Sequence, residues 1–571
     1  MSRRVGKKMK KTLIPLFVAT LLLSGCSFSL GEETSNASSE ADSLATTSSE
    51  DKPSEETPSE QPSVATSQTE APKYKMYNGF SYPSEARYDV NANYVEFWSP
   101  DTKIMMEIEA SPAIWKLMDQ HGHIDSITTN DLYWPVTVTF DINGRKEVFE
   151  EVGMRRRGNS SRNYYFMDGD VVNTAFSFKL SFNELWDDEI YKNYGNNIYK
   201  SWTKTDPEWV IRDDREFLRD EEGRGHKKLD FKMYKTGDHS MINQQFAFSL
   251  FQKEGLIAQN STLAAVKVKS GANESNMGVI TINEPINKHL IRRYFSRAEA
   301  GGELYKVGWD GAGITHDHNK GNLRFEDYEN NNLIIGEEDK FLPYEPRYDA
   351  KEYDDKLPHS EAHAKLINLM KVLKDNETKT PSEYIEAIEA VVDMPSFLNY
   401  AALAYLTGNQ DDMRNNGNNY YIYFLPSNGK AHFIPYDYDW ALGLGYNDDG
   451  GLSMANLSPF HSKLQGNNRN EQDNRLFMYT IIDSQDGMYN IETNKAWQNA
   501  YYNRIQAVVA SDFFSKETFN DLFNKYKHNY DALTFTLNGN NHEVTNGFQS
   551  TNLFSEYYDL ITQSLRNNPP A

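Results

Sequence analysis

Two aromatic-rich runs separated by an Asn-Gly turn constrain the fold of this chain more than any other feature. The runs are NYYIYFL (419–425) and AHFIPY (431–436), and the SNGK between them is typical of a tight β-hairpin. A hairpin brings its two open ends together. The polar loop before the first run, which contains Asp411 and Asp412, is therefore expected to lie beside the DYD that follows the second run.

Asp437 and Asp439 are the acids that follow the second run, and they lie among Tyr436, Tyr438 and Trp440. An unpaired ionised carboxylate in such apolar surroundings is costly. A metal ion, a basic partner or solvent must therefore neutralise the pair. The spacing does not match an EF-hand loop, which needs Gly at its sixth position and a distal Glu.

Residues 1–25 predict a targeting segment, because a basic run, MSRRVGKKMKK, precedes a short apolar run, LIPLFVATLLL. The LSGC that ends at Cys26 resembles the bacterial lipobox, and Cys26 is the only cysteine in the chain. We expect Cys26 to be lipidated, which would leave a protein without disulfides, anchored outside the cytoplasm to the bacterial cell membrane. Residues 26–72 are rich in Ser, Thr, Glu and Pro and predict a disordered tether.

The net charge argues against a nucleic-acid partner. It is −23 for the whole chain, and removal of the six basic residues of segment 1–25, which has no acidic residue, lowers it to −29. Nonspecific binding to DNA or RNA depends on Lys and Arg that displace counterions from phosphates. We therefore expect no nucleic-acid binding, although a local basic pocket remains compatible with this charge.

The order of elements predicts an α+β protein with a β-rich first part, a helix-rich second part and a cleft between two lobes. The expected strands of the first part are YVEFWSP, IMMEIEA, WPVTVTFDING, EVFEEVGMRRRG and AFSFKLSF. The strands LAAVKVKS and MGVITINE follow a first helix, INQQFAFSLFQKEG. Three further helices are HSEAHAKLINLMKVLKD, PSEYIEAIEAVVD and MPSFLNYAALAYLTG, and the chain after Lys495 is largely helical. We expect a β-rich extension over residues 73–135 and one domain over residues 136–571.

A loop acid, a hairpin and a strand-end acid form the arrangement that phosphoryl transfer uses in protein kinases. One carboxylate accepts the proton of the attacking hydroxyl, while an Asn and a second carboxylate hold a divalent metal. Mg²⁺ and Mn²⁺ prefer such oxygen ligands. Other chemistries find less support: His316 and His318 have no third zinc ligand at useful spacing, and HExxH, P-loop, GxGxxG and GxSxG motifs are absent.

Five motifs, in this order along residues 136–445, resemble those of the CotH kinase family of spore-coat and secreted atypical kinases. They are RRRGNSSR, NEPINKHLIRRYF, ELYK, NNYYIYF and FIPYDYDWALG. The resemblance implies an atypical kinase fold that uses ATP and Mg²⁺ or Mn²⁺ to phosphorylate Ser or Thr of an exported or cell-surface protein.

The resemblance also assigns roles around the hairpin. It places the catalytic acid at Asp411, a metal-binding amide at Asn419, and the metal-binding acid at Asp437 or Asp439. The stretch DDMRNNGNN is long and rich in Asn, so Asp412 can replace Asp411 as the base. For the same reason the amide can come from other residues of the stretch, namely Asn415, Asn416 or Asn418. The family's usual Trp before the acids is Tyr436 here.

The nucleotide contacts that the resemblance implies lie earlier in the chain. The loop over the phosphates would be formed by Arg157, Gly158, Asn159, Ser160 and Ser161. Lys179, in FSFKLSF, is placed like the strand lysine that steadies nucleotide phosphates, and Glu284 resembles its partner glutamate. Two alternatives remain open: a non-catalytic surface protein that binds a partner or a glycan on a degenerate kinase scaffold, and a transferase that moves AMP. The substrate and the role of the region after residue 453 stay open as well.

Overall fold

The computed structural model describes most of the chain after residue 73. The described residues are 74–77, 80–83, 91–122, 132–158, 166–167, 170–171, 175–194, 198–219, 225–296, 298–307, 335–336, 346–374, 380–415, 417–445, 450–460, 475–481, 491–544 and 547–567. The chain divides into two compact units, residues 1–69 and 70–571, and all described residues belong to the second. The predicted signal peptide, Cys26 and the predicted tether therefore lie outside the described residues.

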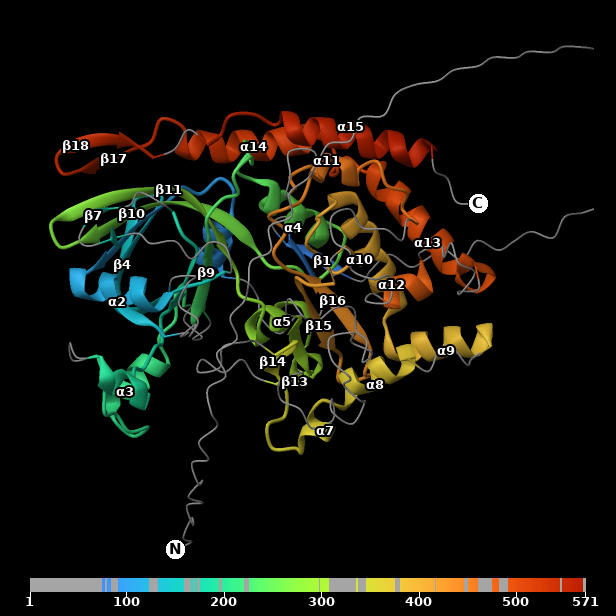
Figure 1. Ribbon diagram of the computed structural model, residues 1–571, viewed down its shortest axis with the longest axis horizontal. Coiled ribbons are helices and arrows are strands. Elements are labelled where there is room, and N and C mark those ends of the chain that lie inside the picture. The colour runs from blue at the N-terminus through green and yellow to red at the C-terminus, as the bar shows by residue number, and fades with distance from the viewer. Residues whose placement is uncertain are drawn as a thin grey trace, which may run out of the picture. The chain divides into compact units, whose positions relative to one another are not determined.

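Seven strands close into a barrel in the order β10-β11-β9-β8-β5-β4-β3. Neighbouring strands are antiparallel except β3 and β10, which run parallel and close the barrel. The strands are β3 (Ile104–Ala110), β4 (Trp134–Ile142), β5 (Arg145–Arg156), β8 (Phe178–Ser181), β9 (Lys228–Lys232), β10 (Ser261–Ser270) and β11 (Asn273–Asn283). Figure 1 shows this barrel in blue and green.

Alternating side chains explain the barrel strands. Along β4 every second residue is buried, from Trp134 through Val138 to Ile142, and these side chains fill the barrel core. The DING turn between β4 and β5 has positive φ at Asn143 (51°) and Gly144 (90°), as a tight hairpin requires. The expected boundary between residues 135 and 136 falls inside β4, and β3 before it belongs to the same barrel.

One predicted strand is wrong. YVEFW lies in the helix α1 (Ala92–Trp98), and the side chain of Asn91 caps this helix by accepting a hydrogen bond from the Tyr94 N–H at 2.8 Å. Tyr94, Phe97 and Trp98 follow helical spacing and are all buried. Burial of these three rings on one face therefore favours a helix over the strand that the aromatic content suggested.

A second sheet has the order β13-β14-β12-β15-β16. Its strands are β12 (Leu304–Val307), β13 (Ile335–Gly336), β14 (Tyr348–Glu352), β15 (Tyr420–Phe424) and β16 (Ala431–Pro435). The predicted hairpin is confirmed, because β15 and β16 pair antiparallel with Tyr420 opposite Pro435. Both strands are buried along their whole length, since one face packs in the core that contains α10 and the other packs against α5.

The other described helices lie along the whole chain and are most frequent in its second half. They are α2 (Pro112–Gly122), η1 (Glu189–Asn193), α3 (Pro207–Asp213), α4 (Asn243–Lys253), α5 (Lys288–Tyr294), η2 (Glu299–Gly301), α7 (His359–Ala362), α8 (Ala364–Lys374), α9 (Pro381–Val391), α10 (Met394–Thr407), α11 (Gly450–Met454), α12 (Arg475–Thr480), α13 (Ile491–Val509), α14 (Lys516–Tyr530) and α15 (Asn552–Asn567). α10 begins at an Asp393 cap that accepts from the Ser396 N–H at 3.0 Å, and it packs against α4, α13 and β16. No described helix is long and apolar enough to cross a membrane.

The last part of the chain returns to the barrel (Figure 1). On α14, the Tyr530 hydroxyl donates to the Leu263 carbonyl at 2.7 Å and accepts from the Ile104 N–H at 3.1 Å. It therefore bridges β10 and β3 where the barrel closes. Three two-stranded sheets complete the fold: β1 (Tyr74–Tyr77) with β2 (Phe80–Pro83), β6 (Phe166–Met167) with β7 (Asp170–Val171), and β17 (Thr534–Leu537) with β18 (Asn540–Glu543). The predicted α+β class is confirmed, and closure of the β-rich part into a barrel is an addition to it.

Candidate active site

Two loops meet at the open end of the β15–β16 hairpin, as predicted. The Asp411 loop (residues 408–419) follows α10, and the Asp437 loop (residues 436–443) follows β16. The Leu442 N–H donates to the Thr407 carbonyl at 2.7 Å, and the Asn409 side-chain amide donates to the Asp437 carbonyl at 3.2 Å. Residues far apart in the sequence are therefore hydrogen-bonded neighbours in this site.

Left-handed backbone conformations turn the chain sharply in both loops. Gly408 ends α10 with φ 57°, and Asn419 (54°) and Asp437 (61°) flank the hairpin. Asn and Asp tolerate this conformation better than other non-glycine residues, and such strain gathers at functional sites. The strained backbone at Asp437 accordingly marks this residue as one whose position matters.

The C-terminal helix α15 backs both loops. A Cβ atom at Gly408 would collide with the Tyr557 hydroxyl, and one at Gly443 would lie 3.0 Å from Tyr557 Cβ and 3.3 Å from Leu553 Cγ. Both glycines have positive φ and lie against this helix. The helix therefore shapes the loops that carry the acids, which gives a role to a region that sequence reasoning left open.

Asp411 is half-buried and held by two amides. The Asn418 and Asn419 side-chain amides each donate to one of its carboxylate oxygens at 2.9 Å, and Asn419 also donates to its carbonyl at 2.7 Å. Its own N–H donates to Asn409 Oδ1 at 3.1 Å. The carboxylate therefore has a fixed orientation and still reaches the surface.

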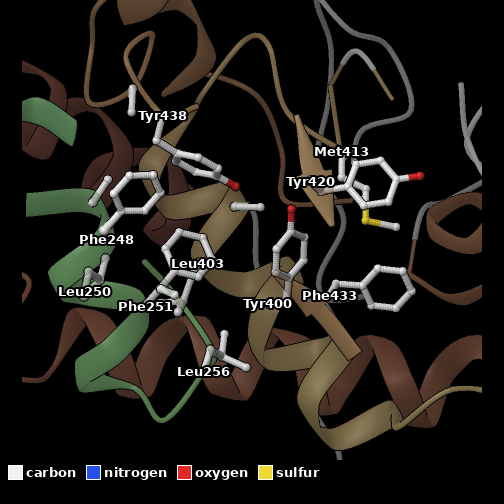
Figure 2. Close-up of a cluster of buried hydrophobic side chains, with 14 of the residues drawn as sticks. Phe248, Leu250, Phe251, Leu256, Tyr400, Leu403, Met413, Tyr420, Phe433 and Tyr438 are labelled. Atoms are coloured by element: carbon white, nitrogen blue, oxygen red, sulfur yellow. The ribbon is translucent and has the colours of Figure 1, made fainter. Parts of the chain in front are cut away.

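Asp412 is fully buried (0% exposed) and serves the loop instead. Its carboxylate accepts the Asn415 N–H at 2.8 Å and the Tyr438 hydroxyl at 3.3 Å, so it links the two loops. Tyr438 packs on Phe248 and Phe251 with ring centroids 5.9 and 5.2 Å apart (Figure 2). This acid faces the core, which favours Asp411 over Asp412 as the group that meets a substrate.

Burial of Asp412 predicts that stability depends on pH. Burial raises the pKa of its carboxyl from 3.8 to about 7, although the Asn415 N–H and Arg414 oppose the shift. At a pH between these two pKa values, the carboxyl is protonated more often in the folded chain than in the unfolded chain. The free energy of unfolding therefore falls as pH rises, by at most about 1.4 kcal/mol per pH unit from this group. Asp412→Asn is expected to flatten this slope in urea denaturation followed from about pH 5 to 7. The exposed variant Asp355→Asn is the control, and an unchanged slope in Asp412→Asn would contradict the assignment.

Asp437 and Asp439 are neutralised by lysines of the barrel side. Lys232, the last residue of β9, donates to Asp437 Oδ1 and lies 2.7 Å from Asp439 Oδ2. Lys235 Nζ lies 3.3 Å from the same Asp439 oxygen and 4.6 Å from the centre of the Trp440 ring. Burial lowers the pKa of Lys232, while Asp439 acts in the opposite direction. Of the three neutralisers that the sequence left open, the described residues supply a basic partner.

Further cations lie around Tyr436 and Asp230. Arg157 donates to the Tyr436 hydroxyl and lies 2.8 Å from Asp230 Oδ2, and Lys179 Nζ lies 3.5 Å from Asp230 Oδ1. Burial alone would raise the pKa of Tyr436, but Arg157 and Lys306 outweigh it and lower that pKa. Burial also opposes ionisation of Asp230, yet Arg157 and Lys179 lower its pKa to about 2. A cluster of positive charge therefore lies next to the acid pair in a strongly acidic protein.

The family comparison covers both loops and the barrel strands β9, β10 and β11. A family model described as CotH kinase protein matches residues 211–567, more than half of the chain. The chain belongs to the CotH kinase family. The match begins after Arg157 and Lys179, which it therefore does not include. It continues past residue 445, where the motif resemblance ended, and reaches the end of α15. No curated protein was found to match the chain.

Within this CotH kinase family protein, Glu284 and Lys179 have different partners. Glu284 is 2% exposed, forms an ion pair with Arg293 and accepts the Tyr94 hydroxyl at 3.0 Å. The Asn260 backbone N–H and side-chain amide donate to it at 3.2 and 3.0 Å. Lys179 instead pairs with Asp230 on the neighbouring strand β9. The structure therefore places Asp230 beside the lysine, where the sequence led us to expect Glu284.

Oxygen donors of the kind that a hard divalent cation prefers lie on both loops of this CotH kinase family protein. The two carboxylates of Asp437 and Asp439 lie on one loop, and Asn418 Oδ1 is buried without a hydrogen-bond partner among the described residues. Mg²⁺ and Mn²⁺ favour such oxygens. In the part of the chain that the structure describes, no group of three or more His, Cys, Asp and Glu side chains is suited to a metal. Any metal here would therefore need amide, phosphate or water oxygens as well.

Some candidate residues lie outside the described residues, and others were missed. Asn159, Ser160, Ser161, Asn416 and the two histidines at 316 and 318 are not described. Sequence reasoning did not single out Asp230, Lys232 or Lys235. Their signal was the run KLDFKMYK, in which two charged residues, at positions 230 and 232, alternate with the buried Leu229 and Phe231. Such alternation is typical of any half-buried strand, so the pattern predicted a strand but not that its charged face belongs to the site.

Proposed function

We propose that this CotH kinase family protein is an atypical protein kinase. It transfers the γ-phosphoryl group of ATP to a Ser or Thr hydroxyl of an exported or cell-surface protein. The observation that supports this most is the direct bonding of barrel cations to the Asp437 loop, through Arg157 to Tyr436 and Lys232 to the acid pair. Groups suited to phosphates and groups suited to a metal and a proton thus share one site. We infer that the nucleotide binds between the barrel and the helical part, as between the two lobes of a kinase.

Asp411 is the general base of the proposed reaction. It accepts the proton of the attacking Ser or Thr hydroxyl, because it is half-buried and its two oxygens are oriented by Asn418 and Asn419. Fixed orientation matters because proton transfer requires the carboxylate within hydrogen-bond reach of the hydroxyl. Asp412 supports the loop from beneath.

Asn419, Asp437 and Asp439 would hold Mg²⁺ or Mn²⁺. When bound, the ion would neutralise charge on the β- and γ-phosphates. Arg157 and Lys179 would contact the phosphates from the barrel side, and residues 158–161 would cover them with backbone N–H groups. Each of these cations already lies next to an anionic partner, Asp230, so it is oriented toward this site before a nucleotide arrives.

Location outside the cytoplasm is a further part of the proposal. Lipidation of Cys26 would anchor the protein to the cell membrane, and residues 26–72 would hold the enzyme away from it. Its substrate would then be a protein of the same compartment.

Labelled ATP tests the activity. The purified chain, incubated with ATP and Mg²⁺ or Mn²⁺, is expected to phosphorylate itself or a Ser-rich protein such as casein. Intact-mass measurement should show added phosphate, and Asp437→Ala should lose it while the exposed control Asp355→Ala keeps it.

The alternatives give different masses. An added AMP in place of phosphate would support nucleotide transfer on the same fold. An unchanged mass, together with no thermal shift on addition of ATP, would contradict the enzyme and support a non-catalytic binding protein.

A further inference from the structure

Lys232 occupies the position between the two acids of the Asp437 loop. Its ammonium donates to Asp437 and lies 2.7 Å from Asp439 Oδ2. Its side chain is 13% exposed, against 24% for Asp437 and 14% for Asp439. The lysine ends β9 of the barrel, whereas the acids follow β16 of the second sheet, so this contact crosses between two separate sheets.

This contact has a direct electrostatic consequence. Two carboxylates held close together and partly buried repel each other, and a shared cation removes that cost. A divalent ion that binds the same oxygens would lie within a few ångströms of the ammonium, and the two positive charges would repel strongly in this partly buried site. Lys232 and a metal therefore compete for the same acids.

A phosphate bound near Asp230 would offer Lys232 another acceptor. Asp230 lies two residues earlier on β9 and already gathers Arg157 and Lys179, the proposed phosphate contacts. A lysine ammonium is a compact point charge on a flexible four-carbon chain. Phosphate oxygens brought to this cation cluster would be within the range of such a side chain.

We propose that Lys232 is a resident counter-cation that competes with the divalent metal for Asp437 and Asp439 and is released to the phosphates when nucleotide binds. Lys232 is thus a positioning residue that couples the affinities for metal and nucleotide. The inference rests on the proposed function, because it takes Asp437 and Asp439 as the metal ligands. Without metal, the lysine keeps the acid pair neutralised and the loop folded.

Binding of Mn²⁺ alone to the full-length chain tests the competition without turnover. Lys232→Met is expected to lower the Mn²⁺ dissociation constant about tenfold or more, because the cation that contacts both acids is gone and only Lys235 still contacts Asp439. Titration calorimetry or the electron paramagnetic resonance signal of free Mn²⁺ measures this. Mn²⁺ should also raise the melting temperature of Lys232→Met more than that of the unaltered chain.

Addition of ADP tests the coupling. In the unaltered chain ADP is expected to tighten Mn²⁺ binding about fivefold or more, since the phosphates give Lys232 another acceptor. This gain should shrink in Lys232→Met. Lys232→Arg retains the charge and should keep the affinity of the unaltered chain, and Lys228→Met, an exposed lysine on the same strand, should change nothing.

The outcomes separate the inference from the proposed function. If Asp437→Asn abolishes Mn²⁺ binding but Lys232→Met binds Mn²⁺ like the unaltered chain, the competition is overturned and the metal site stands. If none of the proteins binds Mn²⁺, the metal site fails and the competition fails with it. Circular dichroism verifies that each variant folds, and Lys232→Gln replaces Lys232→Met if the latter does not.

Discussion

Asp411→Asn is expected to lower the rate of phosphoryl transfer by about 10²- to 10⁴-fold, the range typical for loss of a general base. Asparagine fills the same volume but does not accept the proton of the attacking hydroxyl at neutral pH. It also loses one of the two oxygens that hold the amides of Asn418 and Asn419. The initial rate of transfer from labelled ATP, measured over a range of substrate concentrations, should show a lower kcat with little change in KM.

Two matched variants decide between the acids of the stretch DDMRNNGNN. Asp355→Asn, on the surface, should leave the rate unchanged. Asp412→Asn should act mainly on stability, because this carboxyl faces the core and not a substrate. A larger loss of kcat in Asp412→Asn than in Asp411→Asn would reverse the assignment of the base.

Glu284→Ala is expected to destabilise the protein by about 3–5 kcal/mol, as removal of one member of a buried ion pair usually does. The change leaves Arg293 charged and buried, and it also removes acceptors for Tyr94 and Asn260. Because these residues join α1, α5, the segment after β11 and the segment before β10, their loss would loosen the packing of these parts against one another. The midpoint of urea denaturation at constant slope measures the effect.

A double-mutant cycle isolates the pair. The loss of unfolding free energy in the double variant Glu284→Gln/Arg293→Met should be smaller than the sum of the losses in the two single variants. Each single variant leaves one buried charge without its partner, whereas the double variant leaves none. The nucleotide role that the family resemblance implies for Glu284 predicts otherwise. If Glu284→Ala keeps its denaturation midpoint and weakens only ADP binding, the structural role is contradicted.

The hairpin and the acids around it could be predicted because their signals are local. An Asn-Gly turn between two apolar runs specifies antiparallel pairing, and pairing brings the flanking loops together whatever the rest of the chain does. The αL conformation at Gly408 likewise follows from a Gly at the end of a helical pattern. The meeting of the Asp411 loop with the Asp437 loop depended on these short-range rules alone.

The partners of the acids could not be predicted, because they come from distant segments. Lys232 lies about 200 residues before Asp437, and no local rule states which strand end faces which loop. Barrel closure has the same origin, since it rests on parallel pairing between β3 and β10, which are far apart in sequence. The aromatic run at residues 94–98 misled for another reason: aromatic residues favour strands, but a good cap at Asn91 and burial at helical spacing outweigh that weak preference.

The wall that α15 forms behind both loops has a consequence for the timing of activity. A chain is made from its N-terminus, and its parts fold in that order. The acids, their lysines and the hairpin are all synthesised before Tyr557 and Leu553, which lie against the two loop glycines. An unfinished chain therefore carries every proposed catalytic group yet lacks the surface that sets their positions. We therefore expect the proposed activity only in the completed molecule, and a nonsense mutation between residue 443 and α15 should abolish it while leaving these chemical groups in the chain.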